Sequence, residues 1–452
     1  MSKVSGKATA EELLAKAQQP MKDAIRLHSF YGGKIETALK CRVKDWNDFA
    51  IWYTPGVSAP CLEIEADPKK AYEYTNKWNR IAVVSDGTRV LGMGDIGPKG
   101  ALPVMEGKCL LFKYLGGVDA VPITLDTKDP EEIIRTVLLL QPAFGGINLE
   151  DISHPKCFEI LDRLRAEAEI CIFHDDQQGT ATVILAALIN ALKVVGKKMN
   201  EVKIAFVGSG AACVATARLL FAAGVRPELT LMVDSKGILH RDRKDISGRK
   251  DEFKHKWHLC QITNAKGRRG AAAEALEGAD VCIAMSKSEP GTIKPEWVRK
   301  MAKDSILFPL ANPLPEIWPW VAREAGARII ATGRSDFPNQ VNNSNGFPAI
   351  FRGALDVRAK TITDEMCLAA ADSMAKRAEE SGLDDESITP NMNDMEMFCR
   401  EAVAVGMKAQ EQGVALLKMD AATAYKKAKT IIERAQNMTQ SMMREGFIPK
   451  AD

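Results

Sequence analysis

The chain has 452 residues, of which 46% are hydrophobic and 27% are charged. Its 61 Lys and Arg residues nearly balance its 59 Asp and Glu residues, giving a formal net charge of +2. This balance excludes the strong basic field that recruits nucleic acid or an anionic membrane surface. A chain of this length exceeds a single hydrophobic core, so we expect two or three domains that act on a small molecule.

The cysteines and the N-terminus indicate the compartment. The ten cysteines are scattered singly without a CxxC pair, which argues against a disulfide framework and against a structural zinc site. The first residues, 1–14, are polar and lack the apolar core of a signal peptide. No run of about 18 apolar residues offers a membrane span. We therefore expect a soluble, cytoplasmic protein with no membrane partner.

The N-terminal part of the chain has a mixed pattern. Residues 1–20 are predicted to form a tail that enters a first helix. Two apolar runs followed by turn residues, at 81–87 and 118–126, are predicted to be buried strands. Residues 130–146 are predicted to be a helix that stops at a glycine. These elements predict an α/β domain over residues 21–178.

The pattern changes from about residue 179. An apolar helix is followed by short apolar strands with helical segments between them, which is typical of a parallel sheet with helices on both faces. The predicted strands lie within 202–207, 229–234, 279–286, 305–313 and 327–333. We expect an α/β fold with a Rossmann-type parallel-sheet dinucleotide domain at 179–341. The remainder, 342–452, is predicted to be a helical segment that packs back on the N-terminal domain.

The first strand of this second region leads into a glycine turn that predicts a dinucleotide site. Gly208, Ser209, Gly210 and Ala211 follow the strand and open a helix. The first glycine permits a tight turn, and the second lets a pyrophosphate approach the backbone and the free N–H groups of the helix. A glycine turn can also serve only to pack a helix against a strand. The strand before this turn and the helix after it make that interpretation weaker.

The residues after the next strand leave the choice of nucleotide open. Asp234 ends that strand and would hydrogen-bond the adenosine ribose, which favours NAD. Ser235, Lys236, Arg241 and Arg243 follow at once and could instead hold the 2′-phosphate of NADP.

Two pairs of adjacent acids predict a metal site. Glu150 with Asp151, and Asp175 with Asp176, each follow an apolar stretch. Adjacent carboxylates in apolar surroundings are costly to ionise unless a cation compensates them. Oxygen ligands of this kind suit Mg²⁺ or Mn²⁺. Either pair alone is more often a solvated turn, but two pairs ahead of a dinucleotide fold weaken that interpretation.

Five motifs occur in order along about 300 residues. They are WYTPGVSAP (52–60), VVSDGTRVLGMGDIGPKGALPVMEGKCLLFK (83–113), INLEDI (147–152), FHDDQQGTATV (173–183) and NQVNNSNGFP (339–348). Together they resemble the successive signatures of the malic enzyme family, and the chain length resembles its short bacterial-type members. The resemblance implies oxidative decarboxylation of malate to pyruvate and CO₂ with reduction of NAD or NADP.

The resemblance also assigns roles around the carboxylates. It implies that Glu150, Asp151 and Asp176 bind Mg²⁺ or Mn²⁺, and that Lys108 is the base that removes the proton of the malate hydroxyl. Asp175 would orient that lysine or a metal-bound water. Acting as a base near neutral pH requires a depressed lysine pKa, which a nearby divalent cation would favour and Asp175 would oppose.

Four further residues are assigned in the same way. Tyr53 is implied to protonate C3 of the product, and Arg89 to bind a substrate carboxylate. Asn312 and Asn343 are implied to contact the substrate, and Asn312 also the nucleotide. A homodimer or a higher homo-oligomer is implied as well. Two alternatives stay open: a malolactic enzyme, which releases lactate, and a nucleotide-binding module without activity.

Overall fold

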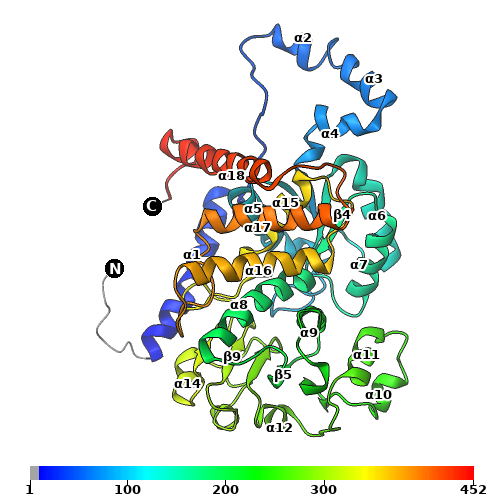
Figure 1. The fold of residues 1–452 in the computed structure, drawn as a ribbon. Helices are drawn as coiled ribbons and strands as arrows, with labels where there is room; N and C mark the ends of the chain where they lie inside the picture. Colours follow the sequence, from blue (N-terminus) through cyan, green and yellow to red (C-terminus); the bar gives the residue numbers. More distant parts are fainter. Residues whose placement is uncertain (1–9, 452) are drawn as a thin grey trace.

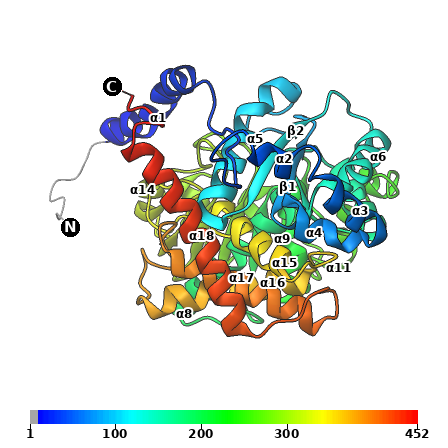
Figure 2. The same ribbon diagram turned by 90° about the horizontal axis from the view of Figure 1, so that it is seen from above.

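The computed structural model describes residues 10–451, with side chains from residue 18 onward. The first nine residues of the predicted tail lie outside the described residues. From Ala10 the rest of that tail is already helical and begins α1 (Ala10–Tyr31). In both views α1 lies beside the C-terminal end of the chain (Figures 1 and 2), where the Tyr31 hydroxyl donates to the Pro449 carbonyl at 2.9 Å.

The first sheet has four parallel strands in the order β2-β1-β3-β4. They are β1 (Arg80–Ser85), β2 (Asp119–Thr124), β3 (Gly146–Leu149) and β4 (Cys171–His174). The strands β3 and β4 are fully buried because helices cover the sheet, and they read as continuous apolar runs. The second predicted strand forms as β2, but it lies at the sheet edge and is only partly buried.

The crossovers of this sheet include one long helix that the sequence analysis did not predict. They are α5 (Gly97–Gly116), α6 (Pro130–Leu140) and α7 (Lys156–Glu167). α5 contains two prolines, Pro98 and Pro103, and prolines usually indicate that a helix is absent or ends. Pro98 lies in the first turn, where its missing N–H costs nothing. The buried face of α5, which includes Met105 and Phe112, holds it against the core.

The second sheet confirms the predicted Rossmann-type arrangement. Its strands are β5 (Ile204–Val207), β6 (Thr230–Asp234), β7 (Gly237–Ile238), β8 (Val281–Ala284), β9 (Ile306–Pro309) and β10 (Ile329–Ile330). Their order is β10-β9-β8-β5-β6-β7, and all pairs are parallel except β6 with β7. The connections leave β5 toward opposite sides of the sheet, so the carboxyl ends of β5 and β8 border a crevice.

The α-helices of this part are α8 (Thr180–Val195), α9 (Ala211–Ala222), α10 (Lys244–Ser247), α11 (Lys254–Ile262), α12 (Ala272–Leu276), α13 (Pro295–Val298) and α14 (Pro319–Glu324). By length and hydropathy alone, Asp175–Val195 could cross a membrane, but 72% of that window is buried inside the protein. Its helix α8 packs on α9 and on α16 (Asp364–Glu380), so it is a core helix between the two sheets.

The remaining C-terminal helices are α15 (Phe347–Asp356), α17 (Met395–Glu411) and α18 (Ala421–Arg444). They cover the first sheet, as both views show (Figures 1 and 2). Phe112 of α5 contacts Phe347 and Phe351 of α15 with ring centroids 4.5 and 5.2 Å apart. The buried Arg352 donates to Asn79 at 2.5 Å and pairs with Asp356 at 2.8 Å. The C-terminal segment therefore completes the core of the N-terminal region.

One segment lies apart from both sheets. The helices α2 (Asp48–Trp52), α3 (Ser58–Ala66) and α4 (Ala71–Tyr74) form an arm, and α2 and α3 project away from the sheets (Figure 1). None of the residues of α2 and α3 is buried. Apolar side chains are exposed along this arm and the segment that leads to it, among them Leu39, Trp46, Ile51 and Leu62. An exposed apolar area of this kind marks an interaction surface.

Candidate active site

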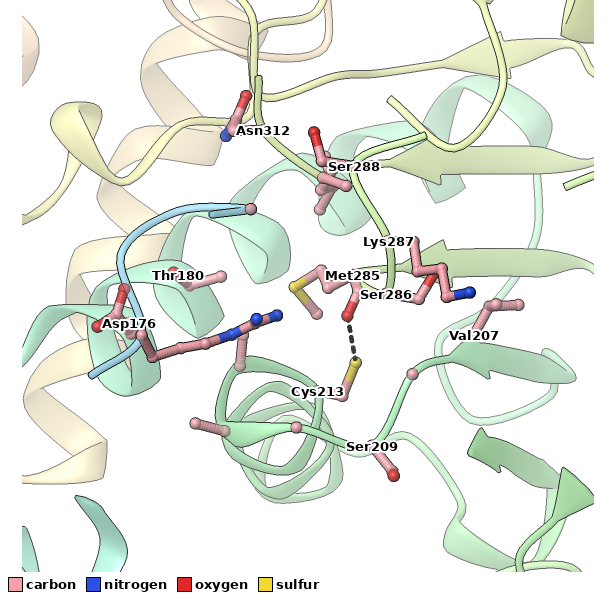
Figure 3. Close-up of a pocket in the computed structure, with 18 of the residues that line it drawn as sticks. Asp176, Thr180, Val207, Ser209, Cys213, Met285, Ser286, Lys287, Ser288 and Asn312 are labelled. Carbon is pink, nitrogen blue, oxygen red and sulfur yellow. Dashed lines mark hydrogen bonds between the residues drawn. The ribbon is translucent and has the colours of Figure 1, made fainter. Parts of the chain in front are cut away.

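A single cleft of about 1960 Å³ joins the two sheets. It runs from the acids after β3 and β4, past the glycine turn after β5, to the end of β6. Figure 3 shows Asp176 and Thr180 on one side of it, Ser209 and Cys213 at the turn, and Asn312 across from them. The cleft therefore brings the two predicted sites into one space.

Strand register explains why the two acidic pairs meet. β3 and β4 are neighbours, with Leu149 opposite His174 at their carboxyl ends. The residues that follow, Glu150 and Asp151 on one side and Asp175 and Asp176 on the other, therefore leave the same edge of the sheet. Ligand atoms of Glu150, Asp151 and Asp176 all lie within 4.8 Å of one another. This is a spacing at which three carboxylates can share one cation.

Backbone geometry ties the two pairs together. Asp151 has φ of 55°, the left-handed region that Asp tolerates better than most residues. In that conformation its N–H donates to an Asp176 carboxylate oxygen at 2.8 Å, and its carbonyl accepts the Arg89 N–H at 2.9 Å. Asp151 Oδ2 is buried and has no partner among the described residues. An orphaned buried carboxylate oxygen fits a metal ligand.

The buried carboxylates of this cluster repel one another, which disfavours their ionised forms. Burial, followed by the neighbouring carboxylates, raises the pKa of Glu150 and Asp151 well above the usual range, although Lys108 opposes the rise. Burial also raises the pKa of Asp175, to about 6, and that of Asp176. Cations are too few here to balance four carboxylates, and an all-oxygen donor set is what Mg²⁺ or Mn²⁺ requires. The residues therefore fit a hard divalent ion.

Lys108 lies in the middle of α5 rather than at a strand end. Its ammonium contacts the carboxylate of Asp175, lies 3.1 Å from Glu150 and sits 4.5 Å above the Phe347 ring. Burial lowers the pKa of Lys108, but the carboxylates of Asp175, Glu150 and Asp176 outweigh burial and raise it. The carboxylates thus raise the pKa of Lys108, the effect that the sequence analysis expected of Asp175. The lowering expected from a divalent cation concerns the metal-bound site and stays a prediction.

Asp175 is the centre of a buried hydrogen-bond group. Its Oδ2 accepts from both Lys108 and Asn343, and its Oδ1 has no partner among the described residues. The turn Asp175–Gly179 is a π-helical turn. A side chain at Gly179 would overlap Asp175 Oδ1, so glycine is required there. Asp175 of the fourth motif and Asn343 of the fifth are thus joined across 168 positions of sequence.

Arg89 and Asn312 line the same cleft from opposite sheets. Arg89 follows β1, and its positive charge helps to offset the carboxylate of Asp176. Asn312 follows β9, and a Cβ at Gly333 would lie 2.6 Å from its side-chain nitrogen. Both residues therefore border the space between the carboxylates and the glycine turn.

The glycine turn has the geometry that a pyrophosphate needs. Gly208 has φ of 126°, and a Cβ there would lie 2.6 Å from the Met285 carbonyl oxygen. A Cβ at Gly210 would meet nothing closer than His154, at 3.9 Å, so this backbone faces open space. Cys213 is buried and its sulfur lies 3.8 Å from the Met285 oxygen, which packs α9 against the end of β8 (Figure 3).

The far end of the cleft differs from the sequence expectation for Asp234. Its carboxylate pairs with Arg243 at 2.8 Å and with Lys256 at 2.6 Å. Burial raises the pKa of Asp234, but Arg243 and Lys256 outweigh burial and lower it. Ser235 and Lys236 line the cleft beside it. Arg241 does not line it and donates to the Gln261 carbonyl at 3.1 Å instead.

The structure does not bring Tyr53 to the cleft. Tyr53 ends α2 on the projecting arm, its residue surface is 72% exposed, and it is not among the residues that line the cleft. Of the residues assigned from the resemblance, it is the one that this chain folds away from the carboxylates.

Sequence reasoning missed a buried acid that shapes the cleft. Glu316 is fully buried, and its carboxylate accepts from the Ser286 N–H at 2.8 Å and the Ala311 N–H at 3.1 Å. It therefore ties the loop after β8 to the loop that carries Asn312. A lone glutamate in a loop gives no sequence pattern that could identify this contact.

The sequence matches two family descriptions, "Malic enzyme, N-terminal domain" over residues 32–165 and "Malic enzyme, NAD binding domain" over residues 177–410. It is 51% identical to the NAD-dependent malic enzyme of Geobacillus stearothermophilus, over 85% of this chain and 78% of that one. It is 48% identical to the bifunctional malic/malolactic enzyme of Bacillus subtilis, over 88% and 95%. An NADP-dependent malic enzyme of Halomonas elongata is 42% identical, over 85% and 92%.

The fold is similar to that of solved malic enzymes. The crystal structure of the Entamoeba histolytica malic enzyme superposes with a TM-score of 0.96 at 45% identity, covering 99% of this chain and 93% of that one.

Proposed function

The chain belongs to the malic enzyme family, and on that premise we propose that it converts (S)-malate to pyruvate and CO₂ with reduction of NAD or NADP. The observation that carries the proposal is the single cleft in which Lys108 and the carboxylates face the glycine turn. Oxidation of a hydroxyl needs a base and a hydride acceptor in contact with the same carbon. A cleft that joins both sites supports this chemistry.

Three carboxylates are proposed to hold the metal. Glu150, Asp151 and Asp176 would bind Mg²⁺ or Mn²⁺, which supplies Lewis-acid polarisation of a substrate oxygen when bound. The mutual proximity of their ligand atoms and the unpartnered Asp151 oxygen support this assignment.

The proton steps are assigned to this chain's own residues. Lys108, as the free amine, takes the proton of the malate C2 hydroxyl as that carbon is oxidised. Asp175 contacts the nitrogen of Lys108, and Asn343 donates to the same carboxylate oxygen of Asp175 and so positions it. Arg89 binds a substrate carboxylate from the end of β1, and Asn312 faces it from the second sheet. Loss of the C4 carboxylate as CO₂ leaves C3 to be protonated, which we assign to Tyr53.

Since Tyr53 lies away from the cleft of its own chain, we propose that it serves the cleft of a second copy in a homodimer. The exposed apolar residues of the arm support this assembly, because a monomer rarely leaves such side chains in water. Leu91 and Leu110, which line the cleft, are also exposed. They offer an apolar surface on which such an arm could dock.

The domain division is proposed from the same geometry. Residues 21–178 would form the substrate and metal domain, residues 179–341 the dinucleotide domain, and residues 342–452 a helical segment that packs on the former. The separate sheets of residues 80–174 and 204–330 support this division.

A spectrophotometric assay tests the activity. Malate, Mn²⁺ and either nucleotide should give a malate-dependent rise in absorbance at 340 nm together with pyruvate. Formation of lactate without net reduced nucleotide would overturn the proposal in favour of a malolactic enzyme. That second candidate is favoured by one observation, the 48% identity to a bifunctional malic/malolactic enzyme.

Mixed dimers test the role of Tyr53. Subunits carrying Lys108→Ala and subunits carrying Tyr53→Phe should each be inactive alone. Co-expressed, they should regain activity if Tyr53 acts across the interface, since one cleft of each mixed dimer then has both groups intact. If Tyr53 acts within its own chain, the mixture stays inactive.

A further inference from the structure

The carboxylate of Asp234 has no free acceptor position for a ribose hydroxyl. Oδ1 accepts from Arg243 at 3.0 Å and from the Lys236 N–H at 2.9 Å. Oδ2 accepts from Arg243 at 2.8 Å and from Lys256 at 2.6 Å. A carboxylate offers about four acceptor positions, so these four bonds fill them. In NAD binding the ribose 2′- and 3′-hydroxyls would have to displace a charge-assisted bond.

Positive charge also exceeds negative charge at this end of the cleft. The acids Asp234 and Asp245 face the cations Arg243, Lys256 and Lys236. Arg243 is shared between the two acids, with Asp245 at 2.7 Å. The two acids therefore fix the positions of the buried cations but do not neutralise all three cations. Lys236, the most exposed of the three, is the cation left with the weakest pairing.

Three groups at the mouth of this end remain able to contact an anion. The Lys236 side chain is 67% exposed, and its pair with Asp245 is long, at 3.3 Å. The Arg269 side chain is also 67% exposed and lines the cleft, with its partner Asp242 equally exposed at 71%. The Ser235 hydroxyl lines the cleft and has no hydrogen-bond partner among the described residues. Exposed ion pairs cost little to rearrange.

We propose that this end of the cleft binds the 2′-phosphate of the adenosine ribose through Ser235, Lys236 and Arg269, so that the enzyme prefers NADP to NAD. The inference rests on the proposed function, since it concerns the nucleotide of the same cleft. Asp234 then acts as an internal anchor for Arg243 and Lys256 rather than as the ligand of the ribose. Relatives that use NAD and relatives that use NADP are both similar to this chain, so the local geometry has to decide.

Binding of nucleotide fragments tests the inference without catalysis. Titration calorimetry of the full chain with adenosine 2′,5′-bisphosphate and with 5′-AMP needs neither malate nor metal. We expect the 2′-phosphate to tighten binding by about tenfold or more, the gain of one to two charge-assisted contacts. The difference should shrink as salt rises, because exposed charges are screened. Equal affinity for the two fragments would overturn the inference.

Single substitutions locate the effect. Lys236→Ala and Arg269→Ala should each weaken the bisphosphate by about tenfold and leave 5′-AMP binding within about twofold. Lys250→Ala removes an exposed lysine that does not line the cleft and serves as the matched control. If both substitutions weaken the two fragments equally, the contacts serve the pyrophosphate or the fold, and the 2′-phosphate assignment is wrong.

Kinetics separate this inference from the proposed function. The wild type should show higher kcat/KM with NADP than with NAD, and Lys236→Ala should lower the NADP value more than the NAD value. Malate oxidation with a preference for NAD would refute the inference and leave the proposed function standing. Preferential binding of the bisphosphate without oxidation of malate by either nucleotide would refute the proposed function alone.

Discussion

The two ends of the cleft are built from the same kinds of charged side chain, but acids are in excess at one end and cations at the other. At the carboxylate end, Glu150, Asp151 and Asp176 crowd together with Lys108, and their pKa values are raised. At the adenosine end, Asp234 is surrounded by cations and its pKa is lowered. Both ends lie where strands of a parallel sheet finish. The fold therefore provides the location, and the surplus of charge selects the ligand.

This difference explains why an acid is a metal ligand at one end and a structural anchor at the other. A buried carboxylate without sufficient cations is costly to ionise, so a bound cation lowers its free energy. A carboxylate already bonded to Arg243 and Lys256 gains nothing from another partner. Each end can be disturbed separately by changing its balance.

The largest expected effect comes from removing the cation of the carboxylate end. Lys108→Ala should lower kcat for malate oxidation by about 10²–10⁴-fold, the usual contribution of a general base. It should do so across neutral pH. Among the described residues, the other lysine that lines this end of the cleft is Lys34, and its ammonium donates to the Pro103 carbonyl at 2.8 Å. Lys99→Ala, an exposed lysine of the same helix, is the control. Near-normal oxidation in Lys108→Ala would show that another group is the base.

Removing an acid from the same end should weaken the metal. Asp176→Asn replaces a charged ligand with a neutral amide, and we expect the Kd for Mn²⁺ to rise by at least ~10-fold. Titration calorimetry with Mn²⁺ measures this directly, and Glu201→Gln at an exposed turn is the control. An unchanged affinity for Mn²⁺ would place the ion elsewhere.

At the adenosine end the analogous change should act in the opposite direction. Asp234→Asn leaves Arg243 and Lys256 without their shared anion, so the melting temperature should fall by ~2–4 °C or more. Adenosine 2′,5′-bisphosphate should then raise the melting temperature more than it does in the wild type, because its phosphate replaces the lost charge. Equal stabilisation of both proteins would contradict the proposed balance.

The smallest effect is expected from a buried acid outside the cleft that has no charged partner among the described residues. Glu401 on α17 is fully buried, and neither of its carboxylate oxygens has a partner among the described residues. Burial raises its pKa well above the usual range. Below the unfolded pKa the group is neutral in both states. As pH rises through that value, the unfolded state ionises first and stability falls.

Glu401→Gln should remove this loss, because glutamine stays neutral. The melting temperature of the variant relative to the wild type should be higher at pH 8 than at pH 5, by ~2 °C or more. Glu411→Gln, an exposed acid near the end of the same helix, should show no such dependence. A difference that does not change with pH would mean that Glu401 is ionised and paired in solution.

The sequence by itself determined the parts of this protein that depend on neighbouring residues. The strand that runs into Gly208, the helix that follows it and the two acidic pairs at strand ends are local patterns, and each lies in the structure where its spacing predicts. The order of the five motifs indicated the family, which the family matches and the relatives show. Local sequence is sufficient for these features because strand register and turn geometry are set within a few residues.

Only the tertiary structure decided which charged residues, distant in the sequence, lie next to one another. The helix around Lys108 depends on its packing against α15, which lies more than 200 residues later in the chain. The saturation of Asp234 depends on Lys256 from α11, and the distance of Tyr53 from the cleft depends on the direction of the arm. No spacing rule predicts such contacts, since they arise from loops and helices brought together by the core. A carboxylate's role follows from its neighbours in space, and folding supplies these neighbours.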